Sequence, residues 1–122
     1  MGDEPVLVRV VGGANVPTKY WRLNGSWPFG VFELFGDRMR LRLRPRWLGG
    51  VELNAIPNSL RCAFPASIRL RRRVGVGFEL PDGRCWFLWT SQVAEVLQAL
   101  SQAGYPVDNE ERRATKVWQG TP

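Results

Sequence analysis

Two runs of arginine are the most concentrated chemistry in this sequence of 122 residues. Within each run arginine alternates with apolar residues, so the guanidinium groups share one face of an extended strand. Guanidinium groups bind phosphate or carboxylate through paired hydrogen bonds. The alternative is that outward arginines keep the edges of a sheet from pairing with other chains. The sequence therefore predicts an anion- or partner-binding surface made of Arg38, Arg40, Arg42, Arg44, Arg69 and Arg71.

The sequence does not assemble the side chains that an enzyme needs. It contains no histidine, and its acidic residues are scattered, mostly at turns and at expected exposed strand positions. The pairs Gly12-Gly13 and Gly49-Gly50 lack the Lys-Ser/Thr of a phosphate-binding loop and the helix that follows it. We therefore expect a protein that is not an enzyme and that carries no cofactor.

The two cysteines, Cys62 and Cys85, fall in separate expected strands. Without histidine or a Cys-x-x-Cys motif, the chain has too few ligands for a structural zinc site, and we expect no metal. A disulfide between the two cysteines is one alternative. A reducing compartment favours the other, in which both thiols are free and mostly buried.

The first arginine run lies in the second strand of an expected hairpin. Residues 31–35 and 38–43 are strand-like, and Gly36-Asp37 between them is typical of a tight turn. Because side chains alternate across a strand, the apolar residues of the second strand must face a core while its arginines face away from it. These apolar residues are Met39, Leu41 and Leu43.

Strand-like segments fill most of the chain before residue 90. Residues 12–30 contain Pro17, Pro28 and several aromatic residues, and we expect a long irregular connection there. We expect Pro65-Ala66-Ser67 to end a strand, because proline cannot donate a hydrogen bond to a ladder. The other expected strands are residues 6–11, 51–55, 59–64, 68–73, 74–80 and 84–89, the last two joined by a turn at Pro81-Asp82-Gly83.

An amphipathic helix is expected at residues 91–103, directly after the last strand. Its apolar residues recur at the i, i+3, i+4 and i+7 positions of one helix face. Thr90 or Ser91 supplies a hydroxyl for the N-cap, and Gly104 suits the left-handed residue that ends a helix. The residues that we expect to be buried together are Phe78, Phe87, Trp89, Val93, Leu97 and Leu100.

The order of about seven strands and one closing helix is similar to that of pleckstrin-homology-like (PH-like) domains. Small bacterial PH-like proteins of unknown function have a similar end, in which an aromatic-Trp-Thr strand runs straight into the helix. The matching residues here are Gly75-Val-Gly-Phe-Glu-Leu-Pro-Asp-Gly-Arg-Cys-Trp-Phe-Leu-Trp-Thr90 and Val93-Ala-Glu-Val-Leu-Gln-Ala-Leu100.

The resemblance implies a mainly β fold, a bent antiparallel PH-like barrel capped by the C-terminal helix. The single domain would span residues 1–105 with its core in residues 30–104, and residues 106–122 would be a charged tail. Arg38-x-Arg40-x-Arg42 matches the second-strand pattern of phosphoinositide-binding members, whereas Glu33 stands where the first strand of those members has a basic residue.

Several partners follow from these observations. The net charge of +6 favours an acidic one. We expect a binding or adaptor module that recognises a protein, or an acidic membrane surface, through the arginine-rich strands. A small basic β-barrel that binds nucleic acid is the alternative, and a structural subunit that adds residues 6–11 to a neighbour's sheet is a third.

The location and the assembly of the protein are less defined by its sequence. No stretch approaches the roughly 18 apolar residues of a membrane span, and the first residues lack the basic and apolar regions of a signal peptide. We expect a cytoplasmic protein that can bind peripherally to a membrane. The oligomeric state stays open.

Overall fold

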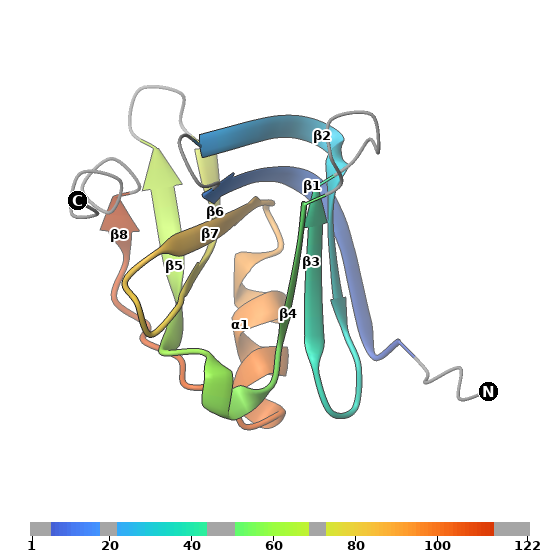
Figure 1. The fold of residues 1–122 in the computed structure, drawn as a ribbon, viewed down its shortest axis with the longest axis vertical. Helices are drawn as coiled ribbons and strands as arrows, with labels where there is room; N and C mark the ends of the chain where they lie inside the picture. Colours follow the sequence, from blue (N-terminus) through green and yellow to red (C-terminus); the bar gives the residue numbers. More distant parts are fainter. Residues whose placement is uncertain (1–5, 18–21, 44–50, 69–72, 114–122) are drawn as a thin grey trace.

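The structure is a computed structural model that describes residues 6–17, 22–43, 51–68 and 73–113. Eight strands form one sheet with the order β4-β3-β2-β1-β7-β6-β5-β8 (Figure 1). The first seven are antiparallel to their neighbours, and β8 is parallel to β5. The elements are β1 (Val8–Pro17), β2 (Arg22–Leu34), β3 (Met39–Leu43), β4 (Val51–Ala55), a 3-10 turn (Pro57–Ser59), β5 (Cys62–Ile68), β6 (Arg73–Glu79), β7 (Cys85–Trp89), α1 (Val93–Gln102) and β8 (Arg112–Arg113).

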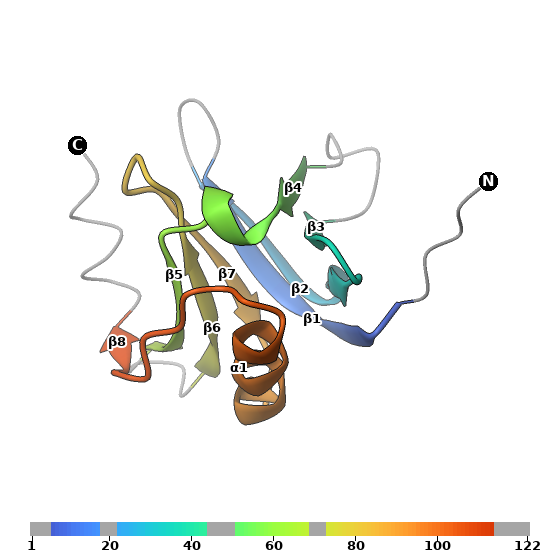
Figure 2. The same cartoon turned by 90° about the horizontal axis from the view of Figure 1, so that it is seen from below.

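The sheet curls around α1, which lies on its concave side (Figure 2). Val96, Leu97 and Leu100 of the helix join one apolar cluster with residues from all seven antiparallel strands. In β3 the expected alternation holds, because Met39, Leu41 and Leu43 are buried in this cluster. The expected fold class is therefore confirmed: the protein is mainly β, with a curled antiparallel half-barrel and one C-terminal helix.

The expected irregular connection at residues 12–30 is wrong. β1 continues through Gly12 and Gly13 to Pro17, and β2 begins at Arg22. The pairing of β1 with β2 shifts register between Gly12 and Ala14, which marks a bulge. A Cβ on Gly12 would collide with the carbonyl oxygen of Trp89, so glycine here lets β7 approach. Gly12 and Gly13 thus lie inside a strand that pairs with both β2 and β7.

The expected strand end at Pro65 is also wrong, because β5 runs from Cys62 to Ile68. Ala63 donates to the carbonyl of Pro106 and accepts from the amide of Asp108, so its backbone polar groups face away from β6. By alternation the nitrogen of Pro65 faces the same edge, where a missing N–H group is tolerated. The expected strand at 68–73 is divided between the end of β5 and the start of β6, and residues 69–72 lie outside the described residues.

The hairpin between β6 and β7 has the expected turn. Leu80 donates to Arg84 and accepts from Gly83, and Gly83 has a φ of 91°. A left-handed residue therefore closes this tight turn, a position that glycine occupies without strain.

The cross-strand register places Phe87 and Trp89 on the outer face of the sheet, opposite α1. Phe78 pairs with Trp86, which belongs to the inner cluster, so Phe87 and Trp89 point the other way. The expectation that they are buried with Phe78 and Leu97 is therefore wrong. They belong to a second, outer cluster of Phe64, Ala66, Cys85, Phe87 and Trp89.

The closing helix is one to two residues shorter at each end than expected. Gln92 occupies the N-cap without a side-chain cap bond, and the Thr90 hydroxyl accepts a hydrogen bond from the amide of Gln92. Gly104 has a φ of 93°, as expected of the residue that ends a helix. The next residue, Tyr105, is buried and donates its hydroxyl to the carbonyl of Ala55 at 2.6 Å. No helix among the described residues is long and apolar enough to cross a membrane.

Candidate functional site

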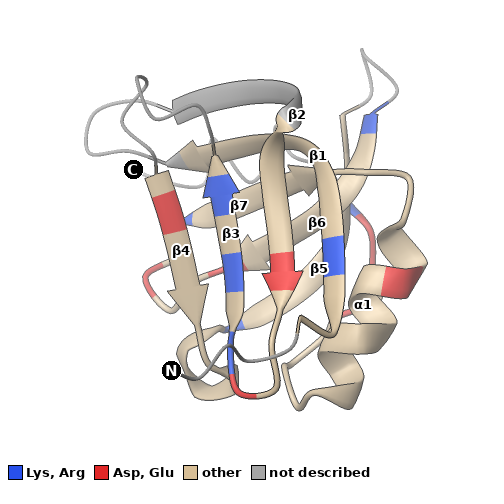
Figure 3. Ribbon diagram, turned by 90° about the vertical axis from the view of Figure 1, so that its right-hand side faces the viewer, with Lys and Arg blue, Asp and Glu red and all other residues tan. Residues whose placement is uncertain are grey.

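Three of the six arginines expected to form the binding surface lie in the described part of the chain. Arg40 and Arg42 belong to β3, and Arg38 directly precedes it. Their side chains lie on the outer face of the sheet, where Figure 3 shows basic residues of β3 and β1 on either side of an acidic residue of β2. The other three, Arg44, Arg69 and Arg71, lie outside the described residues.

The acidic residue at the centre of this face is Glu33, which is only 5% exposed. Its Cα partners are Arg9 in β1 and Arg40 in β3. Arg40 donates to Glu33 Oε1 from Nη2 at 2.6 Å and from Nε at 3.1 Å, and Arg42 Nη2 donates to the same oxygen at 3.1 Å. Arg9 Nε lies 3.9 Å from Oε2. Strand register therefore gathers three arginines around one carboxylate.

Glu33 stays ionised at neutral pH in this setting. Burial alone would raise the pKa of its carboxyl, but the hydrogen bond and charge of Arg40 and the charges of Arg42 and Arg9 outweigh burial and lower it. The cluster thus combines three guanidinium groups with one carboxylate and keeps a net positive charge. The carboxylate also holds the guanidinium groups in place, so less side-chain freedom is lost when a partner binds.

Arg38 extends the basic surface toward the turn between β2 and β3. Its guanidinium lies 4.5 Å from the centre of the Phe35 ring and 3.7 Å from the carboxylate of Asp37. Arg40 lies over the same ring at 5.4 Å. The aromatic face thus supports both guanidinium groups through cation–π contacts.

Exposed apolar side chains lie beside these arginines. Leu7, Val11 and Phe29 are 60%, 40% and 39% exposed. Val11 pairs with Val31, two residues from Glu33 on the same side of the sheet, and by alternation Leu7 and Phe29 share that side. We call this outer surface of β1–β3 the convex face, and it consists of Leu7, Arg9, Val11, Phe29, Glu33, Arg38, Arg40 and Arg42.

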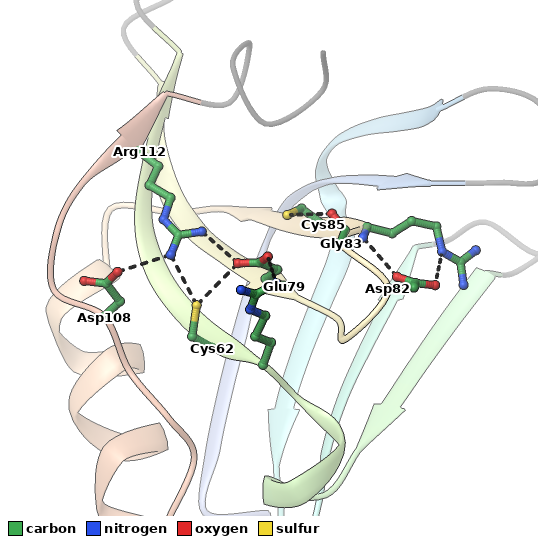
Figure 4. Close-up of polar contacts among 9 residues, drawn as sticks. Cys62, Glu79, Asp82, Gly83, Cys85, Asp108 and Arg112 are labelled. Atoms are coloured by element: carbon green, nitrogen blue, oxygen red, sulfur yellow. Dashed lines mark hydrogen bonds and ion pairs between the residues drawn. The ribbon is translucent and has the colours of Figure 1, made fainter. Parts of the chain in front are cut away.

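A second polar cluster lies at the other end of the sheet, around Glu79 of β6 (Figure 4). Arg112 Nη1 donates to Glu79 Oε1 at 2.8 Å, and Arg61 Nη1 lies 3.5 Å from Oε2. Arg112 Nη2 also donates to Asp108 Oδ2 at 3.1 Å and to Cys62 Sγ at 3.4 Å. The guanidinium of Arg112 lies 4.3 Å from the centre of the Phe64 ring.

Both cysteines are free, as expected. Cys85 is buried, whereas Cys62 is half-buried and contacts the second cluster. Burial raises the pKa of the Cys62 thiol despite the nearby charge of Arg112, so the thiol is protonated at neutral pH and is a weak nucleophile. Within the ranges that the structure describes, no group of three or more acidic or cysteine side chains is arranged to hold a metal ion.

Sequence reasoning missed Arg9, Glu33 and the Glu79 cluster. The acidic residues were expected mostly at turns and exposed strand positions, whereas Glu33 is buried and its strand pairs on both sides with strands that carry arginines. The only available signal was alternation, which puts Arg9, Glu33 and Arg40 at outward positions of three strands. For Arg112 there was only the four-residue spacing from Asp108, within what was expected to be a tail.

Comparisons of the chain with protein-family models, with curated proteins and with solved structures found no match.

Proposed function

We propose that this protein is a noncatalytic, PH-like binding module that recognises an acidic surface of a protein partner through its convex face. The PH-like part rests on connectivity. Seven antiparallel strands are followed by one helix that packs into the concave side of the sheet, which is the arrangement that the resemblance implies. Among the described elements, the helix covers the concave side of β1–β3 and not their outer surface.

The observation that carries the proposal is the arginine cluster around Glu33 beside exposed apolar side chains. Arginine and aromatic residues are enriched where proteins bind one another, and the convex face carries both. Arg9 is 57% exposed at its side chain and Leu7 is 60% exposed, so both can contact a partner without rearrangement. Arg40 and Arg42, at 25% and 20%, are held by Glu33 and present their remaining surface.

The mixed charge of this face favours a protein partner over nucleic acid or a membrane. Glu33 and Asp37 stand among the arginines and reduce the attraction to a uniformly anionic phosphate backbone or lipid surface. A protein can place carboxylates opposite the arginines and apolar groups opposite Leu7 and Val11. Stacking of bases uses several exposed aromatic rings, whereas the aromatic residues at the convex face are Phe29, which is 39% exposed, and Phe35, whose ring is buried beneath two arginines.

Affinity capture with charge variants tests the proposal. In the variant Arg9→Gln/Arg38→Gln the convex face loses two charges but keeps the Arg40–Glu33 pair, whereas Arg40→Glu would bury a second carboxylate beside Glu33. The matched control is Arg61→Gln/Arg84→Gln, which removes two partly exposed arginines elsewhere. We expect the first variant to lose a defined protein partner, identified by mass spectrometry, that wild type and control retain.

The alternatives are measured with the same variants. Vesicles with and without phosphatidylserine and a single-stranded oligonucleotide serve as probes at low and high salt. If the vesicles or the oligonucleotide bind, and this binding requires Arg9 and Arg38, the partner of the convex face is a membrane or a nucleic acid rather than a protein. Equal capture of the same proteins by all three forms would show that the convex face is not a binding surface.

A further inference from the structure

The outer edge of β5 is covered by the chain's own C-terminal segment, Tyr105–Arg113. Ala63 forms a parallel bridge with Val107, and Ala66 and Ser67 pair in parallel with Arg112 and Arg113. The edge of β5 therefore accepts an added strand.

The pairing is interrupted between these two points. Only Phe64 and Pro65 separate the paired residues of β5, whereas residues 108–111 separate those of the segment. Pro65 has no N–H group to donate at this edge, which explains why the segment leaves it here. The segment therefore pairs with β5 at two places rather than along its whole length.

The second attachment depends on a site that fits a guanidinium group. Glu79 supplies the carboxylate, Cys62 a sulfur acceptor and Phe64 an aromatic face, all of them on β5 or β6. Glu79 and Phe64 are largely or fully buried, with 14% of the Glu79 side chain exposed and none of Phe64. Charge, planar donors and cation–π contact select arginine at this position.

The segment leaves a groove beside it unfilled. A groove of about 790 Å³ lies beside it, between α1 and the edge formed by β5 and β6. Its apolar lining includes Ala66, Val74, Val93 and Leu97, and Val74 is 46% exposed. The segment contributes Val107, which packs against the core, and two exposed polar residues, Asn109 and Glu111. An apolar side chain would bury more surface there.

We propose that the edge of β5 and the groove beside α1 form a second binding site, which takes an extended, arginine-bearing segment of a partner protein in the place that Val107–Arg113 occupies. The arginine enters the Glu79–Cys62–Phe64 site, and apolar side chains near it fill the groove. The chain's own segment is a competitor that a better-fitting strand displaces. This site is separate from the convex face and does not depend on its function.

The experiment releases the segment in the whole 122-residue chain and then adds a separate peptide that can take its place. Arg112→Ala removes the guanidinium, and Arg61→Ala is the control, because Arg61 binds the same carboxylate from outside the segment. Hydrogen exchange at the amides of Ala63 and Asp108 reports the first attachment, since these amides bond to Pro106 and Ala63. Arg112 supports this attachment as well, because it donates to the carboxylate of Asp108. We expect both amides to exchange faster in Arg112→Ala and to be unchanged in Arg61→Ala.

The probe is a fluorescent peptide with the sequence of residues 105–113, measured by anisotropy. Because a tethered segment competes at an effective concentration near millimolar, we expect Arg112→Ala to bind the peptide about tenfold more tightly than wild type does. A peptide with Asn109→Leu and Glu111→Leu should bind more tightly still, and a peptide with Arg112→Gln should bind less tightly.

Three results would overturn the proposal. The first is unchanged exchange at Ala63 and Asp108 in Arg112→Ala. The second is a released segment with no binding of either arginine-bearing peptide. The third is a concentration-dependent dimer of Arg112→Ala that excludes the peptides, which would assign the site to a second copy of this chain. If Arg112→Ala does not fold, Arg112→Lys keeps the charge without the planar fork and serves in its place.

Discussion

Glu33 and Glu79 are two largely buried carboxylates that bind arginines on the outer side of one sheet, but their clusters have different structural roles. The arginines around Glu33 come from β1 and β3, the strands beside it, and register alone brings them together. The short contact of Glu79 is with Arg112, which lies 33 residues away in a terminal segment. The first cluster therefore stabilises the middle of the sheet, and the second fixes a segment to its edge.

The largest effect is expected at Glu33. Glu33→Gln leaves the guanidinium groups of Arg40 and Arg42 half-buried without a carboxylate, and breaking such a pair costs about 3 kcal/mol of the free energy of unfolding. Urea unfolding followed by tryptophan fluorescence measures the loss. The control is Glu52→Gln on the exposed outer side of β4, which should change stability by less than about 0.5 kcal/mol. Equal losses in the two variants would contradict a structural role for the Glu33 cluster.

The same carboxylate should make stability depend on pH. The pKa of Glu33 is lowered in the folded protein from its ordinary value of 4.5, so its contribution is fully present above pH 4.5 and is lost as pH falls through the lower, folded pKa. Thermal unfolding of wild type and Glu33→Gln from neutral to acid pH tests this. The difference in melting temperature should narrow only below pH 4.5. If the difference in melting temperature between wild type and Glu33→Gln does not change with pH, the charge of Glu33 does not contribute to stability.

The smallest effect is expected at Glu79. Glu79→Gln should cost about 1 kcal/mol, because its partners Arg112 and Arg61 retain contact with water. The change should be local, with faster hydrogen exchange at Asp108 and little change at the amides of β2 and β3. For Glu33→Gln we expect the reverse pattern, with faster exchange across β1–β3. Similar hydrogen-exchange patterns in the two variants would contradict the conclusion that the Glu33 cluster stabilises the sheet and the Glu79 cluster fixes a segment to its edge.

The parts of the fold that sequence predicted are those where polar and apolar residues alternate. The β2–β3 hairpin, its turn at Gly36-Asp37 and the burial of Met39, Leu41 and Leu43 followed from this pattern. β7 gave no such signal, because all five of its residues are buried, on two different faces. Period-two reasoning cannot assign faces when both faces are covered.

The predicted strand ends before Gly12 and at Pro65 are wrong, because the roles of these two residues depend on a neighbouring strand. Gly12 allows β7 to approach β1, and Pro65 lies where its missing N–H group faces an edge. Neither circumstance is visible before the sheet order is known. The candidate site shows the same limit. The arginines of β3 were found by their spacing, but Glu33 became its centre only through pairing with both neighbours.

The pairing of β1 with β7 has a consequence for how the chain folds. Gly13, Ala14 and Asn15 pair with Trp89, Leu88 and Phe87, and this short ladder joins the β1–β4 part of the sheet to the β5–β8 part. The paired residues are about 70 positions apart in sequence, so this contact carries a large loop-closure entropy and is expected to form late. During synthesis β1 is complete long before its partner exists. Until residues 85–89 leave the ribosome, the middle of β1 is an open strand edge, and this is the stage at which the chain is most exposed to pairing with another copy.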